Sequence, residues 1–191
     1  MRLWTIQPKE VYDILKNNGE FICDITKSSL FDECFKRSYD WLITKMDEKN
    51  INHPIGVDYP IWAWHTMDWK HEKPNLLEDY YGEKGEELIC LELEVPDEDV
   101  LLSDFNLWHF VLNDSWIDDS KNEMEYDLMH EQYDKLSPLE REQLKKDSWN
   151  KIFDITPITY GDWVSIGRYV QACFWKLKLE YVINMETFIC H

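Results

Sequence analysis

The sequence lacks the apolar runs and cysteine patterns that would place it in a membrane or outside the cell. Residues 1–5 show no signal-peptide stretch, and no segment of the 191 residues approaches the length of a membrane-spanning helix. The five cysteines include no C-x-x-C pair and no spacing typical of a metal site, so we expect reduced thiols. These absences predict a cytoplasmic protein that does not associate with membranes.

Basic residues are scarce. Lysine and arginine number 20 against 38 aspartates and glutamates, which gives a net charge of −18. Such a field repels nucleic-acid backbones and anionic lipid, so we expect no direct nucleic-acid binding. The acidic surface serves either solubility alone or the attraction of a basic protein.

Catalytic and metal-binding signatures are also missing. No G-x-S-x-G motif or cysteine–histidine pairing can be placed, and Gly82 and Gly85 do not form a phosphate loop. His65, His71 and Glu72 come nearest to a metal set, but their spacing matches neither a helical pair nor a zinc signature. We therefore expect no metal site.

Aromatic residues, by contrast, are abundant. Ten tryptophans occur within a chain that is 44% hydrophobic, which is ample material for one well-filled core. The length fits one domain, and no repeat or linker divides it, so we expect residues 1–191 to form a single domain. Most of the tryptophans should lie in that core.

The order of expected elements predicts an α+β fold. Strands are expected at 2–6, 20–24, 59–65, 87–95, 100–102 and 170–181, the last as one strand or two. Helices are expected from Pro8 to Asn18, from a cap at Ser29 to Asn50, after a cap at Ser103 or Asp104, and after a capping box at Ser137. Residues 114–135 suggest an exposed helix or an insertion, and 70–85 a loop. Strands at both ends predict a small mixed or antiparallel sheet that includes both chain ends, with helices packed around it.

Several aromatic-polar clusters resemble bacterial family 3841 of the domain-of-unknown-function series. The resemblance covers nearly the whole chain, and it implies no particular activity. The clusters that carry it are Leu3-Trp4-Thr5-Ile6-Gln7, Pro60-Ile61-Trp62-Ala63-Trp64, Leu102-Ser103-Asp104-Phe105 with Trp108-His109, and Ser148-Trp149 with Ile152-Phe153.

The architecture also resembles small ADP-ribosyltransferase folds, which bind NAD in a cleft between two small sheets. In those enzymes a histidine or arginine on the first strand holds the ribose, an aromatic or serine element supports nicotinamide, and an acidic residue or glutamine leads a later strand. The resemblance places these roles on Thr5 or Gln7, on Trp62 or Trp64, and on Gln171.

This chain departs from the transferase pattern at two of these positions. Thr5 and Gln7 replace the histidine, and neutral Gln171 stands where a carboxylate would stabilise developing positive charge. Thr5 and Gln171 are the candidate catalytic residues. Arg2 is either a phosphate contact or a solvent-facing side chain.

Two clusters allow both a functional and a structural interpretation. Strand alternation puts Trp62 and Trp64 on one face, where they either form a wall for a flat ring or pack against a helix. Asp104 and His109 lie about one helical turn apart, which suits acid–base chemistry, although a helix cap is the commoner use of such a pattern.

Three functional hypotheses follow. The first is a divergent ADP-ribosyltransferase-like protein that binds NAD or another nucleotide, and the second is a relative that binds a nucleotide without turnover. The third is a non-enzymatic interaction module, like an inhibitor or antitoxin, whose acidic face meets a basic protein.

Overall fold

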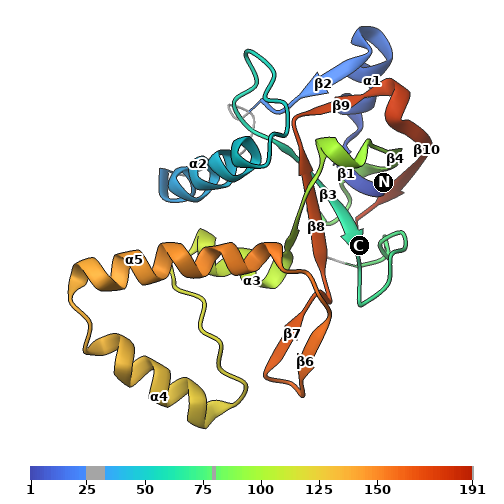
Figure 1. The fold of residues 1–191 in the computed structure, drawn as a ribbon. Helices are drawn as coiled ribbons and strands as arrows, with labels where there is room; N and C mark the ends of the chain where they lie inside the picture. The colour runs from blue at the N-terminus through green and yellow to red at the C-terminus, as the bar shows by residue number, and fades with distance from the viewer. Residues whose placement is uncertain (25–32, 79–80, 191) are drawn as a thin grey trace.

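A six-stranded antiparallel sheet organises the fold (Figure 1). The computed structural model describes residues 1–24, 33–78 and 81–190. The first and last strands of the chain belong to the same sheet, with one strand between them, which confirms the predicted α+β class. In spatial order the strands are β10 (Val182–Ile189), β4 (Glu87–Glu94), β1 (Arg2–Pro8), β3 (Ile61–Thr66), β8 (Val170–Phe174) and β5 (Leu101–Asp104).

The sheet consists of two three-stranded halves that meet at one point. β1 pairs with β4 along its whole length, and β3 pairs with β8 from Ile61 to Thr66. Between β1 and β3, however, the only register pair among the described residues is Trp4 with Trp64. The strands diverge beyond that pair, and the Thr5 hydroxyl spans the gap by donating to the Trp62 carbonyl at 2.7 Å.

One face of the sheet is covered by α1 (Lys9–Asn18) and by a two-stranded ribbon of β2 (Glu20–Ile22) and β9 (Lys176–Lys178). The helix ends where predicted, because Gly19 adopts the left-handed conformation (φ 79°) and its N–H bonds to the Leu15 carbonyl. Val11 and Leu15 of α1 pack into the apolar core on this face.

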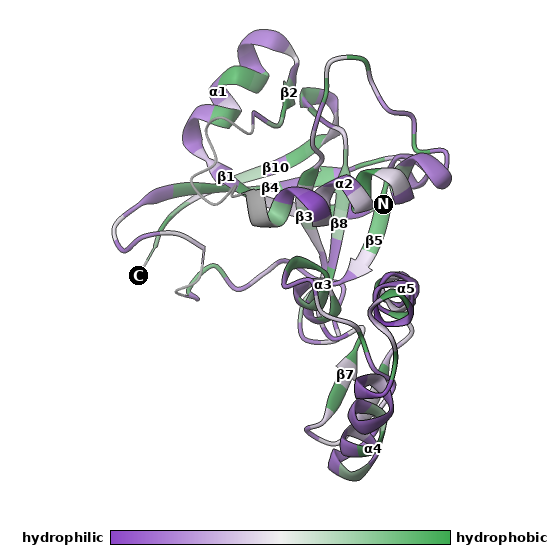
Figure 2. Ribbon diagram, turned by 90° about the vertical axis from the view of Figure 1, so that its left-hand side faces the viewer, coloured by the Kyte–Doolittle hydropathy of each residue, from purple (hydrophilic) through white to green (hydrophobic). Residues whose placement is uncertain are grey.

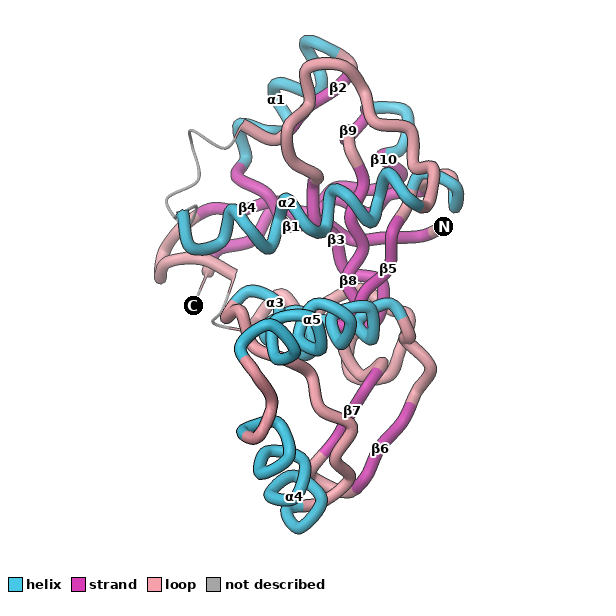
Figure 3. The backbone as a smooth tube through the Cα atoms, turned by 60° about the vertical axis from the view of Figure 1, so that its left-hand side comes forward, coloured by secondary structure: helices cyan, strands magenta, loops and turns pink. Residues whose placement is uncertain are grey.

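The opposite face carries the aromatic core. α2 (Glu33–Glu48), α3 (Phe105–Leu112) and the short 3-10 helix η3 (Trp149–Phe153) pack there, and Figure 3 shows α2 running across the sheet with α3 beside it. Trp108 and Trp149 lie in this core, and Trp4 and Trp175 are also buried. The expectation that most tryptophans lie in the core is thus met in part: these four are buried, four more are half-buried, and Trp69 and Trp163 are exposed.

An arm projects away from the sheet. It contains α4 (Glu123–Asp134), α5 (Pro138–Ser148) and a hairpin of β6 (Ile158–Tyr160) and β7 (Val164–Ile166) (Figures 1 and 3). The predicted capping box opens α5, since Ser137 and Glu140 exchange bonds with each other's backbone N–H. α4 confirms the expected exposed helix, because none of its residues is buried.

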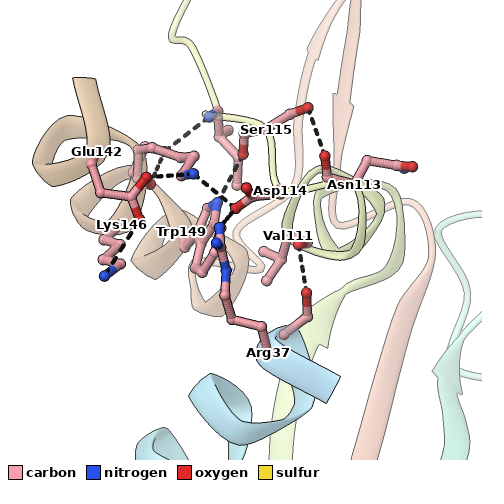
Figure 4. Close-up of polar contacts among 12 residues, drawn as sticks. Arg37, Val111, Asn113, Asp114, Ser115, Glu142, Lys146 and Trp149 are labelled. Atoms are coloured by element: carbon pink, nitrogen blue, oxygen red, sulfur yellow. Dashed lines mark hydrogen bonds and ion pairs between the residues drawn. The ribbon is translucent and has the colours of Figure 1, made fainter. Parts of the chain in front are cut away.

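A polar junction fixes the arm to the body of the protein (Figure 4). Asp114, just after α3, forms ion pairs with Arg37 of α2 and with Lys145 of α5, the latter at 2.8 Å. The Trp149 indole donates to the Ser115 carbonyl at 2.8 Å, and Ser38 donates to the Val111 carbonyl at 2.8 Å. These bonds hold α2, α3 and α5 together.

The C-terminal region corrects the sequence expectation. The alternating pattern predicted strand structure as far as residue 181, but β9 ends at Lys178 and a 3-10 turn, η4 (Leu179–Tyr181), follows. The strand β10 and the β6–β7 hairpin were not predicted. The expected cap at Ser29 lies outside the described residues. None of the helices in the described ranges has the length and apolar character needed to cross a membrane.

Candidate functional site

The two indoles of β3 pack against helices. Trp62 and Trp64 lie on one face of the sheet, opposite Cys173 and Gln171 in the β8 register, as the alternation predicted. Their rings contact α3: the centroids of Trp62 and Trp108 are 5.4 Å apart, and those of Trp64 and Phe105 are 4.9 Å apart. The geometry thus favours the packing interpretation over a free wall for a ligand.

Thr5 and Gln7 belong to the other face. Because Trp4 is directly opposite Trp64, alternation turns Thr5 and Gln7 away from the indoles. Thr5 is fully buried, and its hydroxyl accepts a bond from Gln7 Nε2 at 2.7 Å. Gln171 is also buried and donates to Ser103 Oγ at 3.3 Å.

The register therefore puts Thr5 and Gln7 on one side of the sheet and Trp62, Trp64 and Gln171 on the other. The catalytic roles assigned to Thr5 and Gln171 and the binding roles assigned to Gln7, Trp62 and Trp64 stay predictions. Arg2 is exposed and forms an ion pair with Glu92 at 3.3 Å, which agrees with the solvent-facing alternative.

Asp104 acts as a helix cap. Its carboxylate accepts bonds from the backbone N–H groups of Leu107 at 2.9 Å and Gly167 at 2.6 Å. Burial raises the pKa of Asp104, and the backbone hydrogen bonds oppose that shift. His109 Nδ1 is bonded to the Phe105 carbonyl instead of Asp104. The structural interpretation of this cluster is confirmed.

His65 and His71 form a pair of rings with centroids 4.2 Å apart. His71 Nδ1 donates to the His65 carbonyl at 2.6 Å, and His65 Nδ1 bonds to the Thr66 hydroxyl at 2.9 Å. Burial, and after it the charge of the neighbouring His71, lowers the pKa of His65 to about 4, so this ring is neutral at pH 7. Within the described residues no three histidine, cysteine, aspartate or glutamate side chains gather as a metal ion would require.

A cavity of about 330 Å³ opens elsewhere, where the chain passes from β8 into β9. Its wall combines that crossing with the loop after α2, the end of β4 and the turn at η4. It is lined by Glu20, Asn52, Pro54, Val95, Asp99, Phe174, Trp175, Lys176, Lys178 and Tyr181.

Charges of both signs line this cavity. Lys176 Nζ lies 2.9 Å from Glu20 across the β2–β9 ribbon. Lys178 Nζ lies 5.0 Å from the ring centroid of Tyr181, and a hydrogen bond to Tyr181 raises the pKa of Lys178, so its ammonium stays charged. The Tyr181 hydroxyl donates to Asp99 at 3.4 Å. Two ammonium groups and two carboxylates thus border one hollow.

Trp175 is held on one wall of the cavity by contacts with the loop after α2. The indole donates to the Ile51 carbonyl at 3.4 Å, and the His53 ring stacks on it with centroids 3.8 Å apart and planes within 8°. His53 Nε2 in turn donates to the Val57 carbonyl at 2.8 Å. These bonds tie the loop after α2 to the residue that follows β8.

Comparison with known proteins identifies the family. The model of a domain of unknown function, DUF3841, matches residues 2–183. The chain belongs to this family. The DUF3841 match begins at β1 and reaches the start of β10, so it includes the cavity and the residues predicted from the sequence. No curated protein and no solved structure gives a significant match.

The cavity residues of this DUF3841 protein were missed by sequence reasoning. Lys176 and Lys178 were placed in an alternating strand and Glu20 at the start of a short strand, and neither these residues nor Asp99 were proposed as site residues. The available signal was the pair of lysines two residues apart in a chain with so strong an acidic excess. Nothing in the local pattern indicates that η4 folds Tyr181 back beside them.

Proposed function

We propose that this protein binds a small phosphorylated nucleotide in the cavity bordered by Lys176 and Lys178. The observation that carries the proposal is the pair of cationic side chains at a preformed hollow in a protein of net charge −18. A well-formed hollow on which several polar groups converge is the default candidate for a ligand site.

The two lysines suit a phosphate group. Ammonium groups bind phosphate oxygens through charge-assisted hydrogen bonds, each contributing about 1.5–3 kcal/mol. Lys176 and Lys178 are partly exposed, so a ligand can reach them, and their carboxylate partners are exposed enough to be solvated when a phosphate displaces them. The phosphate is attracted locally although the whole protein repels longer polyanions.

The carboxylate of Asp99 suits a sugar hydroxyl. An acidic side chain that accepts from a ribose hydroxyl is a common feature of nucleotide sites. The volume of about 330 Å³ is near the lower end of the range for small-molecule sites, roughly 300–1,000 Å³. A mononucleotide therefore fits the hollow better than a whole dinucleotide, of which one half would extend into solvent.

The resemblance of the element order to ADP-ribosyltransferase folds keeps NAD among the ligands to be tested. The proposal extends to binding and not to transfer chemistry, because Thr5 and Gln171 are buried, bonded to other side chains and absent from the lining of the cavity.

Thermal unfolding with a ligand panel tests the proposal. The panel comprises AMP, ADP, NAD, adenosine and inorganic phosphate, since a ligand that binds only the folded state adds about 2.7 kcal/mol of stability at a hundred times its Kd. We expect AMP or ADP to raise the Tm more than adenosine or phosphate does. No shift with any phosphorylated nucleotide at millimolar concentration would overturn the proposal.

Charge-removing variants locate the binding. Lys176→Met and Lys178→Met keep the aliphatic stems but remove the ammonium groups, and each should weaken nucleotide binding about tenfold, the effect of losing roughly 1.4 kcal/mol. Lys9→Met is the matched control, because Lys9 is exposed and also pairs with a glutamate, Glu87, at 2.9 Å. If all three variants bind the nucleotide with equal affinity, the binding site does not lie in this cavity.

A further inference from the structure

The helix α4 has two different sides. On one side Tyr126, His130 and Tyr133 contact aromatic rings of the arm: Trp116 stacks on Tyr133 with centroids 4.8 Å apart, and Trp163 of the hairpin contacts Tyr126. These ring contacts hold the helix, since none of its residues is buried. A helix of 12 residues is marginal by itself in water.

The other side presents apolar residues to solvent. Met124 and Leu128 lie one turn apart on that side, with 81% and 54% of their surface exposed. Figure 2 shows α4 at the end of the arm as a mainly hydrophilic helix with a few apolar positions. Methionine and leucine at this spacing form the kind of ridge that receives the apolar face of another helix.

A row of carboxylates runs beside this apolar pair. Glu123, Asp127 and Glu131 are spaced four residues apart, so they follow one line along the helix. Glu131 pairs with Lys135 at 2.8 Å, whereas Glu123 and Asp127 have no ion-pair partner within the described part of the chain. Unpaired like charges at this spacing weaken a helix slightly, so a positively charged partner would stabilise α4.

We propose that the outer side of α4 docks a basic amphipathic helix of another protein. Its apolar residues would cover Met124 and Leu128, and its lysines or arginines would face Glu123, Asp127 and Glu131. Charge decides between occupants, because a second copy of this acidic chain or an anionic membrane would meet the carboxylate row with the same sign of charge. The surface is remote from the Lys176 cavity, so this proposal stands independently of nucleotide binding.

A synthetic helix of leucine and lysine is a suitable probe, with a leucine–glutamate helix as its counterpart. Fluorescence anisotropy of the labelled peptides measures affinity at low and at high salt. We expect the lysine peptide to bind at low salt with an affinity that falls as salt rises, and the glutamate peptide not to bind. Equal binding of both peptides would overturn the proposal.

Two pairs of variants locate the peptide. Met124→Ser with Leu128→Ser removes the apolar pair, and Glu123→Gln with Asp127→Asn removes the unpaired charges while keeping side chains of nearly the same shape. Each pair should weaken binding about tenfold, as expected for residues at the centre of an interface. The matched controls are Leu139→Ser, at a position 82% exposed on α5, and Glu10→Gln with Glu94→Gln, which are exposed on α1 and at the end of β4.

Peptide binding that is unchanged in both arm variants, or weakened equally in the controls, would contradict the assignment. Far-UV circular dichroism checks that α4 persists in the serine variant, and the charge variant keeps the test valid if it does not. Sedimentation that reveals a dimer dissociated by the serine variant would place a second copy on this surface and overturn the proposal.

Discussion

Replacing Asp104 with alanine tests how the arm and the sheet are joined. The carboxylate is fully buried, caps α3 through Leu107 N–H and also holds Gly167 N–H, where the hairpin returns to β8. Loss of a cap costs about 1 kcal/mol, and a buried N–H left without an acceptor costs about 1–3 kcal/mol more. The expected loss is therefore roughly 2–4 kcal/mol, or about 4–16 °C in Tm for a chain of this length.

Urea unfolding of matched variants measures this loss. Asn122→Ala is the control, because Asn122 caps the exposed helix α4 with one bond of 3.0 Å and should cost about 1 kcal/mol or less. If Asp104→Ala costs no more than Asn122→Ala, the bond to Gly167 does not contribute as argued.

Asp104→Asn adds a pH test of the same residue. Burial raises the folded-state pKa of Asp104 above its ordinary value of 3.8. The stability linked to its proton is therefore present below pH 3.8 and is lost as the pH rises through the folded-state pKa. The wild type should be more stable relative to the asparagine variant at pH 3 than at pH 7, and the opposite trend would contradict the assigned shift.

Two further predictions concern residues of the sheet. Thr5→Val removes the hydroxyl that bonds to the Trp62 carbonyl and should lower the free energy of unfolding in urea by about 1–3 kcal/mol, while nucleotide affinity stays unchanged. A clear loss of affinity would show that the nucleotide binds at the sheet and not in the cavity. His65 should titrate near pH 4 by NMR, because its folded-state pKa lies below the ordinary value of 6.5. The stability linked to the neutral ring is present above pH 6.5 and is lost as the pH falls toward 4. Titration near pH 6.5 would show that the ring is not buried as described.

Local signals in the sequence were sufficient for most elements. Gly19 after two asparagines ends α1, and Ser137 with Glu140 opens α5, because caps depend on a few neighbouring residues. The alternation of Trp62 and Trp64 correctly placed both on one face. The resemblance to the DUF3841 family was also confirmed.

The register between neighbouring strands could not be predicted from such local signals. Alternation gives the two faces of each strand, but the pairing of Trp4 with Trp64 decides which face of β1 accompanies which face of β3. A shift of one residue would have put Thr5 and Gln7 beside the indoles. The cavity was missed for a similar reason, since it depends on where β9 stops and η4 turns Tyr181 toward Asp99.

The indole N–H signals in a nitrogen-15 NMR spectrum test the nucleotide site most directly, because each of the ten tryptophans gives its own resonance. Trp175 borders the cavity, whereas Trp62 and Trp64 pack against α3, and Trp→Phe variants assign the three signals. On addition of ADP we expect the Trp175 signal to shift while those of Trp62 and Trp64 stay in place. A spectrum in which Trp62 and Trp64 shift and Trp175 does not, or in which no signal moves, would contradict the account.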